Sequence, residues 1–243
     1  MPRSISPFTL AVAATLLVAC RPKTSSVDAN GDDTGGAGGD GGDGGDGGGV
    51  SSATIADVQQ GVFEEGADVQ LERVVVTSPL NRAGEGFTIQ DQGGGPWSGI
   101  YVYEGGAPSV SRGDTVTVEG RVGDYFGETQ LSDVAVIASS PGGVVDPAPV
   151  TVAEAVTEAY EGVLVTLTDG TVTDDAYDCG PPSGGDCADP GLWEIDGEDG
   201  VIVFDRLYED ADWETHIGSL PVTGVMNYRW DRRRIMPRTA GDF

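Results

Sequence analysis

The chain has 243 residues, of which 40 are acidic and 13 are basic, and its net charge is −27. So negative a chain repels the nucleic-acid backbone and anionic lipid headgroups at long range, which argues against a general polyanion-binding protein. A strongly acidic surface also keeps an exported protein soluble, and we favour this simpler explanation of the charge.

The first twenty residues have the layout of an export signal. Arg3 precedes an uncharged, mostly apolar stretch over residues 5–19, which is too short to span a bilayer comfortably. The stretch ends in Leu17-Val18-Ala19-Cys20, which resembles the lipobox of bacterial lipoproteins at every position. The resemblance implies that a signal peptide, residues 1–19, is removed and that Cys20 then carries fatty-acyl chains such as palmitate. The alternative is a plain secretory peptide with an incidental cysteine.

Several acyl chains would anchor the protein stably to a membrane, whereas one chain would not. Cys20 is followed by Arg21 and not by the aspartate that signals inner-membrane retention in enteric bacteria. By resemblance, we expect a lipid anchor in the outer membrane of the cell envelope, on its periplasmic face or on the cell surface.

Residues 20–52 are predicted to form a flexible linker. Residues 35–49 repeat Gly-Gly-Asp and carry no large apolar side chain, so nothing offsets the entropy that ordering them would cost.

Residues 53–140 are predicted to form a small β domain. In one segment Val116, Val118 and Val122 alternate with polar residues, the period of two that is typical of a half-buried strand. Gly120 lies on the apolar side, where a missing side chain lets a strand bend as a small closed barrel requires. A lead-in at residues 53–61 is followed by expected strands at residues 69–78, 86–90, 99–103, 115–123 and 128–136.

Residues 151–243 repeat this order after a Pro/Gly-rich linker at residues 141–150. A second lead-in at residues 151–159 precedes expected strands at residues 162–173, 192–196, 201–205, 220–228 and 233–237. Five short strands, one of them bent at glycine, and a closing hairpin predict an all-β protein of two tandem five-stranded OB-like Greek-key barrels. The alternative is one sandwich of about ten strands. The internal repeat and the proline-rich boundary favour two barrels.

Both halves resemble the OB-fold domains found beside catalytic domains in secreted bacterial nucleases and in surface lipoproteins. The resemblance covers most of residues 53–243, and its motifs lie at residues 115–132, 160–165, 224–228 and 236–240. Because no nuclease catalytic domain accompanies the two copies in this sequence, the resemblance implies a fold and a binding role but no enzymatic one.

Cys179 and Cys187 lie close together in a loop rich in glycine, proline and aspartate. In an exported protein such a pair predicts a local disulfide bond. The rival interpretation is a metal site, but two thiols without a nearby histidine or further cysteine make a poor zinc site. We therefore predict neither a metal nor a cofactor.

Few residues suit catalysis. His216 is the only histidine, and in a polar connection it is more often solvated than a general base. The sequence has neither a GxSxG nor an HExxH motif. We predict no catalytic residue and a protein that is not an enzyme.

More residues suit ligand binding than catalysis. OB-folds hold ligands on the face of their second and third strands, between two flanking loops. In the second copy the loop between the last two strands is both aromatic and basic. The predicted ligand-binding residues are Tyr228, Arg229, Trp230, Arg232, Arg233 and Arg234. Such residues can stack on bases or sugars and pair with phosphate or carboxylate. Local charge matching favours the alternative, that these arginines neutralise the fifteen acidic residues of the segment 169–214 within the protein.

The first copy has its own aromatic candidates for that face, and we expect half of them to belong to the core. They are Trp97, Tyr101, Tyr103, Tyr125 and Phe126.

The predicted function is therefore that of a non-enzymatic, membrane-anchored lipoprotein, a binding or assembly module for a protein, glycan or nucleic acid. One alternative is a nucleic-acid-binding accessory protein of a secreted nuclease, which would bind through residues 229–234. Another is a calcium-dependent adhesin or carbohydrate binder. The acidic groups at residues 174–178 and 196–199 do not match the spacing of an EF-hand, so we predict no calcium site there.

Overall fold

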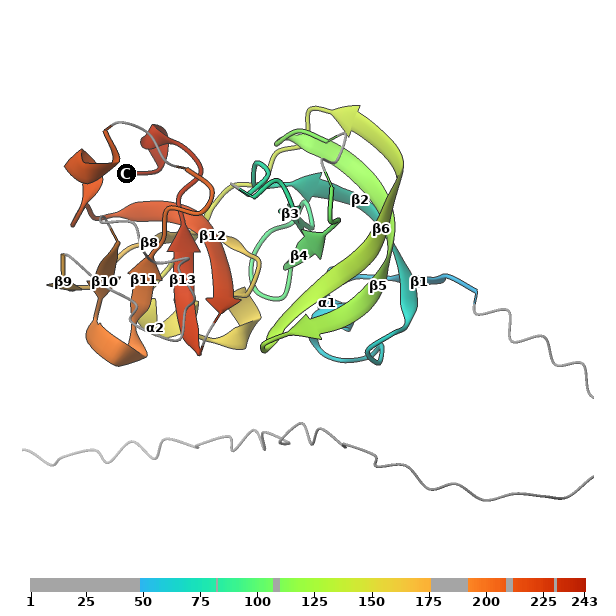
Figure 1. Cartoon of the computed structure of the whole chain (residues 1–243), viewed down its shortest axis with the longest axis horizontal. Coiled ribbons are helices and arrows are strands. Elements are labelled where there is room, and N and C mark those ends of the chain that lie inside the picture. The colour runs from blue at the N-terminus through green and yellow to red at the C-terminus, as the bar shows by residue number, and fades with distance from the viewer. Residues whose placement is uncertain (1–48, 82, 107–109, 176–191, 209–211, 230) are drawn as a thin grey trace, which may run out of the picture. The chain divides into compact units, whose positions relative to one another are not determined.

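The computed structural model describes residues 49–243 apart from residues 82, 107–109, 176–191, 209–211 and 230. The predicted signal peptide, Cys20 and most of the predicted linker therefore lie outside the described residues, as do Cys179, Cys187 and Trp230. The described part belongs to one compact unit, Asp46–Phe243, in which the strands form two sheets without a shared strand (Figure 1).

The first sheet closes on itself. Its order is β1-β2-β3-β4-β6-β5, and a further pairing of β2 with β5 completes a barrel of five strands. In this circuit β4 and β6 are parallel, while the other neighbours are antiparallel. The strands are β1 (Ser51–Ala53), β2 (Asp68–Val76), β3 (Gly86–Gln90), β4 (Gly99–Tyr103), β5 (Asp114–Tyr125) and β6 (Glu128–Pro141).

The predicted bend at Gly120 coincides with an irregularity in the barrel. The register between β5 and β6 shifts between Glu119 and Arg121, so that two strands of twelve and fourteen residues can curve around the core. A Cβ atom at Gly120 would lie 3.0 Å from Cγ2 of Val134, a contact so tight that Val134 would have to move by a few tenths of an ångström. Glycine therefore fits this inward position, where β6 crosses closely.

The second sheet runs through the same circuit. Its order is β7-β8-β12-β13-β11-β10-β9, with β11 and β13 parallel at the position that corresponds to β4 and β6. The end strand β9 follows β8 in the chain, and residues 168–171 alone separate the two strands. The strands are β7 (Ala148–Val150), β8 (Leu164–Leu167), β9 (Val172–Asp174), β10 (Trp193–Ile195), β11 (Val201–Val203), β12 (Val222–Arg229) and β13 (Arg232–Met236). The prediction of an all-β protein with OB-like barrels is confirmed.

The strand expected at residues 162–173 is broken into β8 and β9. Gly170 has a φ of +118°, and a Cβ atom there would lie 2.5 Å from Cγ2 of Ile195. The neighbouring Asp169 accepts a hydrogen bond from the amide of Val152 at 2.8 Å. The break thus lets the first strand turn a corner against the start of the repeat.

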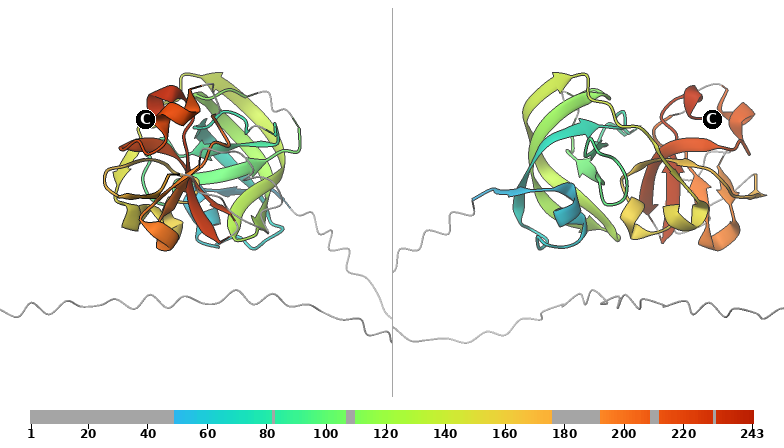
Figure 2. Two further views of the ribbon diagram at one scale, coloured as in Figure 1. Left: turned by 60° about the vertical axis from the view of Figure 1, so that its left-hand side comes forward. Right: turned by 180° about the vertical axis from the view of Figure 1, so that it is seen from behind.

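The lead-in segments form a matching pair at the start of each copy. The helix α1 (Ile55–Gln59) begins at Thr54 and α2 (Val152–Ala155) begins at Thr151, each with a capping box in which the threonine and the third helical residue exchange hydrogen bonds. Each helix lies at one end of its own sheet (Figures 1 and 2).

The strands β1 and β7 were not expected: β1 begins inside the predicted flexible linker 20–52, and β7 lies inside the predicted linker 141–150. Each pairs in parallel with the first barrel strand of its copy, β1 with β2 and β7 with β8. Strands of three residues show no periodicity that a sequence pattern could reveal.

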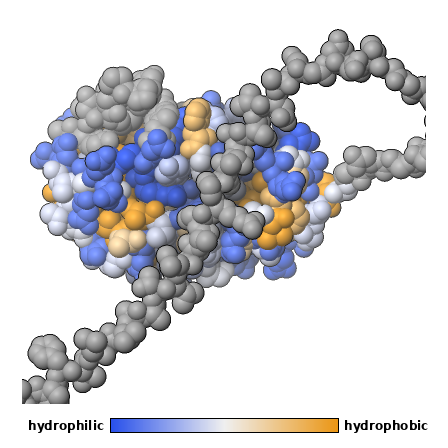
Figure 3. Space-filling model, turned by 90° about the horizontal axis from the view of Figure 1, so that it is seen from below, coloured by the Kyte–Doolittle hydropathy of each residue, from blue (hydrophilic) through white to orange (hydrophobic). Residues whose placement is uncertain are grey.

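Each barrel encloses an apolar core, and a third buried cluster lies on the other side of the second sheet. In β11, Val201 and Val203 face the barrel core, whereas Ile202 belongs to the third cluster with Phe204 and Met236. The described surface is mostly hydrophilic in the view of Figure 3, with small apolar patches. Short 3-10 turns complete the fold at Glu158–Tyr160, Gly197–Asp199, Trp213–His216 and Ala240–Asp242. None of the described helices is long and apolar enough to cross a membrane.

Candidate functional site: a pocket beside β3 and β4

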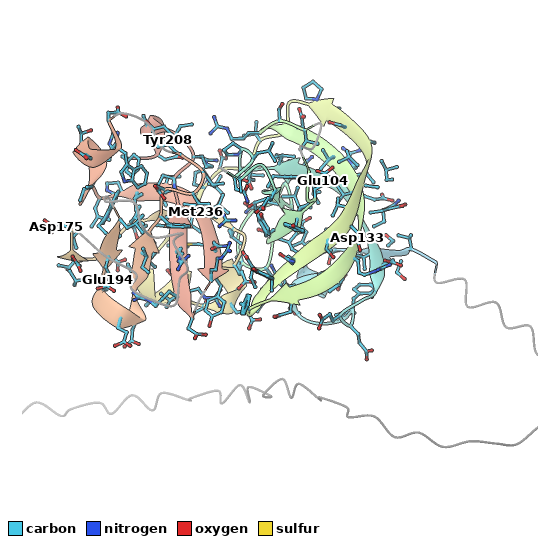
Figure 4. The ribbon with its side chains drawn as sticks, in the orientation of Figure 1. Glu104, Asp133, Asp175, Glu194, Tyr208 and Met236 are labelled. Atoms are coloured by element: carbon cyan, nitrogen blue, oxygen red, sulfur yellow. The ribbon has the colours of Figure 1, made fainter. Side chains whose placement is uncertain are left out.

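A pocket of about 500 Å³ lies beside β3 and β4, the second and third strands of the first barrel. Both barrels line it. The first barrel contributes Asn81, Ala83, Glu85, Thr88, Tyr101, Tyr103, Tyr125, Glu128 and Gln130. The second contributes Arg206, Leu207, Asn227, Arg229 and Met236, of which Met236 is labelled in Figure 4.

Strand alternation places the tyrosines in the pocket wall. In β4, Ile100 and Val102 point into the barrel core, so Tyr101 and Tyr103 point outward. The ring of Tyr101 lies across β3 at Gly86, where a Cβ atom would be 2.6 Å from the ring carbon that bears the hydroxyl. Glycine at position 86 is therefore what makes room for Tyr101.

The hydroxyl of Tyr101 is held from both sides. It accepts a hydrogen bond of 2.8 Å from Nδ2 of Asn81. Burial raises the pKa of Tyr101, while the charge of Arg206, which also hydrogen-bonds to it, opposes the rise. The phenol is therefore neutral at ordinary pH.

Glu128, at the start of β6, is a buried acid in this wall and is 4% exposed. Burial, helped by the nearby charge of Glu161, raises the pKa of Glu128 to about 8, although Arg206 and Arg229 oppose the rise. Its carboxyl is therefore mostly protonated at pH 7, and its Oε1 accepts a hydrogen bond from Nδ2 of Asn227.

Contacts between the barrels fix the two sides of the pocket. Gln90 of β3 is fully buried, and its Oε1 accepts a hydrogen bond of 3.0 Å from the amide of Leu164 in β8. In the opposite direction, Oε1 of Glu161 accepts from the amide of Thr129 in β6 at 2.8 Å. The pocket wall is thus held by buried polar contacts as well as by packing.

Of the residues predicted for ligand binding, the five that the structure describes do not share one site. Arg229 lines the pocket, with its guanidinium carbon 5.6 Å from the centre of the Tyr125 ring. Tyr228 lies outside the pocket lining, donates a hydrogen bond of 3.2 Å to Asp231 and packs under Arg233. Trp230 lies outside the described residues.

The other three arginines of the hairpin engage the protein itself. Arg232 donates to Glu194 at 2.7 Å, where Glu194 lies in β10 (Figure 4). Arg233 donates to Glu161 at 2.6 Å. Arg234 is 2% exposed and stacks over Phe204. The Arg232 contact is of the kind that the intramolecular alternative requires, because Glu194 lies in the segment 169–214, whereas Glu161 precedes that segment. Ligand binding by these arginines stays a prediction.

Three of the five aromatic candidates in the first copy, Tyr101, Tyr103 and Tyr125, line the pocket, whereas Trp97 and Phe126 do not. The sequence analysis missed the polar members of the wall, chiefly Glu128, Asn81, Asn227 and Arg206. Alternation could have placed Thr88 beside the tyrosines, but nothing local indicates that residues of the two copies meet.

His216 lies apart from this pocket. Its ring stacks on that of Phe243 with a centroid distance of 4.3 Å, and its Nε2 is 3.8 Å from a carboxylate oxygen of Asp212. Within the described part of the chain no cluster of three or more His, Cys, Asp or Glu side chains could hold a metal ion. The expectation of a protein without catalytic residues stays a prediction.

No protein-family model matches the chain, and no curated protein matches it significantly. The function is therefore argued from the pocket and the sequence.

Proposed function

We propose that this chain is a non-enzymatic binding module of the cell envelope that holds a ligand in the pocket beside β3 and β4. One observation carries the proposal, which is a pocket of about 500 Å³ on the second and third strands of an OB-like barrel, lined by three tyrosines and several amide and guanidinium groups. This is the face on which OB-folds bind ligands, and the volume lies in the range of small-molecule sites.

A lipid anchor at Cys20 and the Gly/Asp-rich segment after it would hold this module near a membrane. The support is the resemblance of residues 17–20 to a lipobox. In cells fed labelled palmitate, the full chain takes up label and fractionates with membranes, and Cys20→Ser abolishes both. If Cys20→Ser takes up no label but still fractionates with membranes, the proposal of a lipid anchor is refuted.

Binding is tested by a thermal-shift screen of the full-length protein against nucleotides, peptides, lipids and saccharides. A ligand of the pocket raises the melting temperature of the protein, and Tyr103→Ala abolishes that shift. Ile137→Ala is the matched control, because Ile137 is 53% exposed on β6 and does not line the pocket. If no compound of any class gives a shift that depends on Tyr103, the proposed function fails.

The nucleic-acid accessory role is a second candidate, favoured by the presence of Arg229 and three tyrosines in one pocket. Titration with single-stranded DNA over a salt series decides between the two. Under our proposal DNA does not bind even at low salt, where phosphate contacts are strongest. Tight binding that weakens with salt and is lost in Arg229→Ala would favour the accessory role.

A further inference from the structure

Four uncharged side chains of the pocket wall share one chemical property. Asn81, Gln130 and Asn227 carry amides and Thr88 carries a hydroxyl, so each of them both donates and accepts hydrogen bonds. A sugar hydroxyl does the same and can pair with either function. An ionised phosphate or carboxylate only accepts, so it would leave the amide carbonyl groups unmatched.

Asn227 carries an amide oxygen that an anionic ligand, which only accepts hydrogen bonds, could not satisfy. The residue is 5% exposed, and its carboxamide nitrogen is committed to Glu128. Its carboxamide oxygen is buried and has no hydrogen-bond partner among the described residues. A ligand that brings a donor lowers the cost of this unmatched acceptor, whereas a purely anionic ligand does not.

Glu128 adds a donor and removes a charge from the wall. Its carboxyl faces Glu161, Arg206, Arg229, Asn227 and Tyr101, and burial keeps it mostly protonated at pH 7. The neutral acid offers an O–H group where an ionised one could only accept.

The basic groups of the pocket are committed to neighbouring rings. Arg229 lies over the Tyr125 ring, and Arg206 hydrogen-bonds to Tyr101. After residue 50 the sequence has 34 acidic and ten basic residues, none of them lysine. A polyanion would therefore meet a repulsive surface around the pocket.

The tyrosine rings supply the apolar part of the site. Tyr103 is 40% exposed and Tyr125 is 43% exposed, although both rings are large and mostly carbon. Such rings offer flat apolar faces with a hydroxyl at the rim. The C–H face of a pyranose ring packs on a surface of this kind while its hydroxyls reach the surrounding amides.

We propose, resting on the function proposed above, that the pocket binds a neutral carbohydrate of one or two sugar rings, with Tyr103 and Tyr125 as its platform and with Asn81, Gln130, Asn227 and Glu128 as partners of its hydroxyls.

The test is isothermal titration of the full-length protein in detergent with a panel of neutral monosaccharides, methyl glycosides and disaccharides, alongside inorganic phosphate, acetate and adenosine. At least one saccharide binds, and phosphate and acetate do not. Tyr103→Ala weakens that binding at least tenfold, and Asn227→Leu weakens it similarly. Ile137→Ala leaves the affinity unchanged.

Protonation gives a second readout. Affinity for the saccharide falls as pH rises from 7 to 9, because Glu128 loses its proton, and Glu128→Gln keeps its affinity at pH 9. Because Asn227→Leu could perturb folding, its melting temperature is measured as well, and Tyr103→Ala alters only an exposed ring. If Asn227→Leu does not fold, the titrations of Tyr103→Ala and Ile137→Ala decide whether the saccharide binds in this pocket.

Failure of this inference differs from failure of the proposed function. If no saccharide binds, or if adenosine or phosphate binds instead and Tyr103→Ala abolishes that binding, the carbohydrate assignment is overturned while a binding pocket stands. If saccharide binding is unaffected by Tyr103→Ala, the assignment to this pocket is overturned. The proposed function itself falls only when no class of compound binds in a Tyr103-dependent way.

Discussion

Burial of the Glu128 carboxyl group raises its pKa and so removes a negative charge from the pocket at pH 7. Glu128 and Glu161 approach one another where the barrels meet, and both are almost fully buried. Burial also raises the pKa of Glu161, but Arg233 and the Thr129 amide oppose that rise. Glu161 is therefore ion-paired to Arg233, whereas Glu128 carries a proton.

Glu128→Gln should make the free energy of unfolding less sensitive to pH. The folded-state pKa of Glu128 is raised from 4.5 to about 8, so its stabilising contribution is complete below pH 4.5 and is lost as pH rises to 8. The slope is at most about 1.4 kcal/mol per pH unit for one proton. Urea unfolding of the unaltered protein and of Glu128→Gln at pH 5 to 9 measures this slope, and Glu72→Gln, at an exposed position on β2, is the control. An unchanged slope in Glu128→Gln would contradict the assignment.

Glycine at position 99 permits a close approach of the two barrels. A Cβ atom on Gly99 would overlap the carbonyl group of Gly162 and lie 2.6 Å from the amide nitrogen of Val163. Gly99→Ala should lower the free energy of unfolding by roughly 2–3 kcal/mol, because backbone must move on both sides. Gly123→Ala is the control, since no atom of the described residues, its two chain neighbours aside, lies within 4 Å of its Cβ position, and it should change stability by less than about 1 kcal/mol. Equal losses in the two variants would refute the packing argument.

At the scale of elements, the repeat is clearest at the start of each copy. Thr54 and Thr151 cap short helices in the same way, and each helix follows a three-residue strand that pairs with the first barrel strand. So short a helix has little stability of its own and depends on its cap and on packing.

Thr151→Ala should cost about 1 kcal/mol of stability, whereas Thr151→Ser should cost much less, because serine keeps the capping hydroxyl. Chemical unfolding of both variants gives the comparison. If Thr151→Ala and Thr151→Ser lose the same free energy of unfolding, the capping hydrogen bond does not stabilise the fold.

The sequence predicts the elements whose pattern is local. The bounds of β3 and β4 agree with residues 86–90 and 99–103, because in both strands every second residue is a large apolar residue of the barrel core and both strands end at turn-forming residues. The corner at Gly170 escapes prediction, because it depends on packing against Ile195, which lies distant in sequence. The candidate site was predictable only in part for the same reason. The tyrosines of β4 follow from alternation, but no local pattern places Asn227 and Arg229 of the other copy beside Glu128.

For the whole molecule, buried polar groups cross between the copies in both directions. Gln90 of the first copy pairs with the Leu164 amide, and Glu161 of the second pairs with the Thr129 amide. The amide of Trp97 also donates to the carbonyl of Ala159 at 2.5 Å. Because a buried group left without a partner costs about 1–3 kcal/mol, separating the barrels without unfolding them is unfavourable unless water reaches these groups.

The two barrels should therefore unfold together. Calorimetry of the full-length protein is expected to show one transition, with equal calorimetric and van't Hoff enthalpies. Gln90→Leu leaves the Leu164 amide unpaired at the boundary and should split or broaden that transition. Gln70→Leu is the matched control, because it removes a 2.9 Å hydrogen bond to Glu119 inside the first barrel and should only lower the melting temperature. Two separate transitions in the unaltered protein would show that the barrels are energetically independent, and the pocket would then lack a fixed second wall.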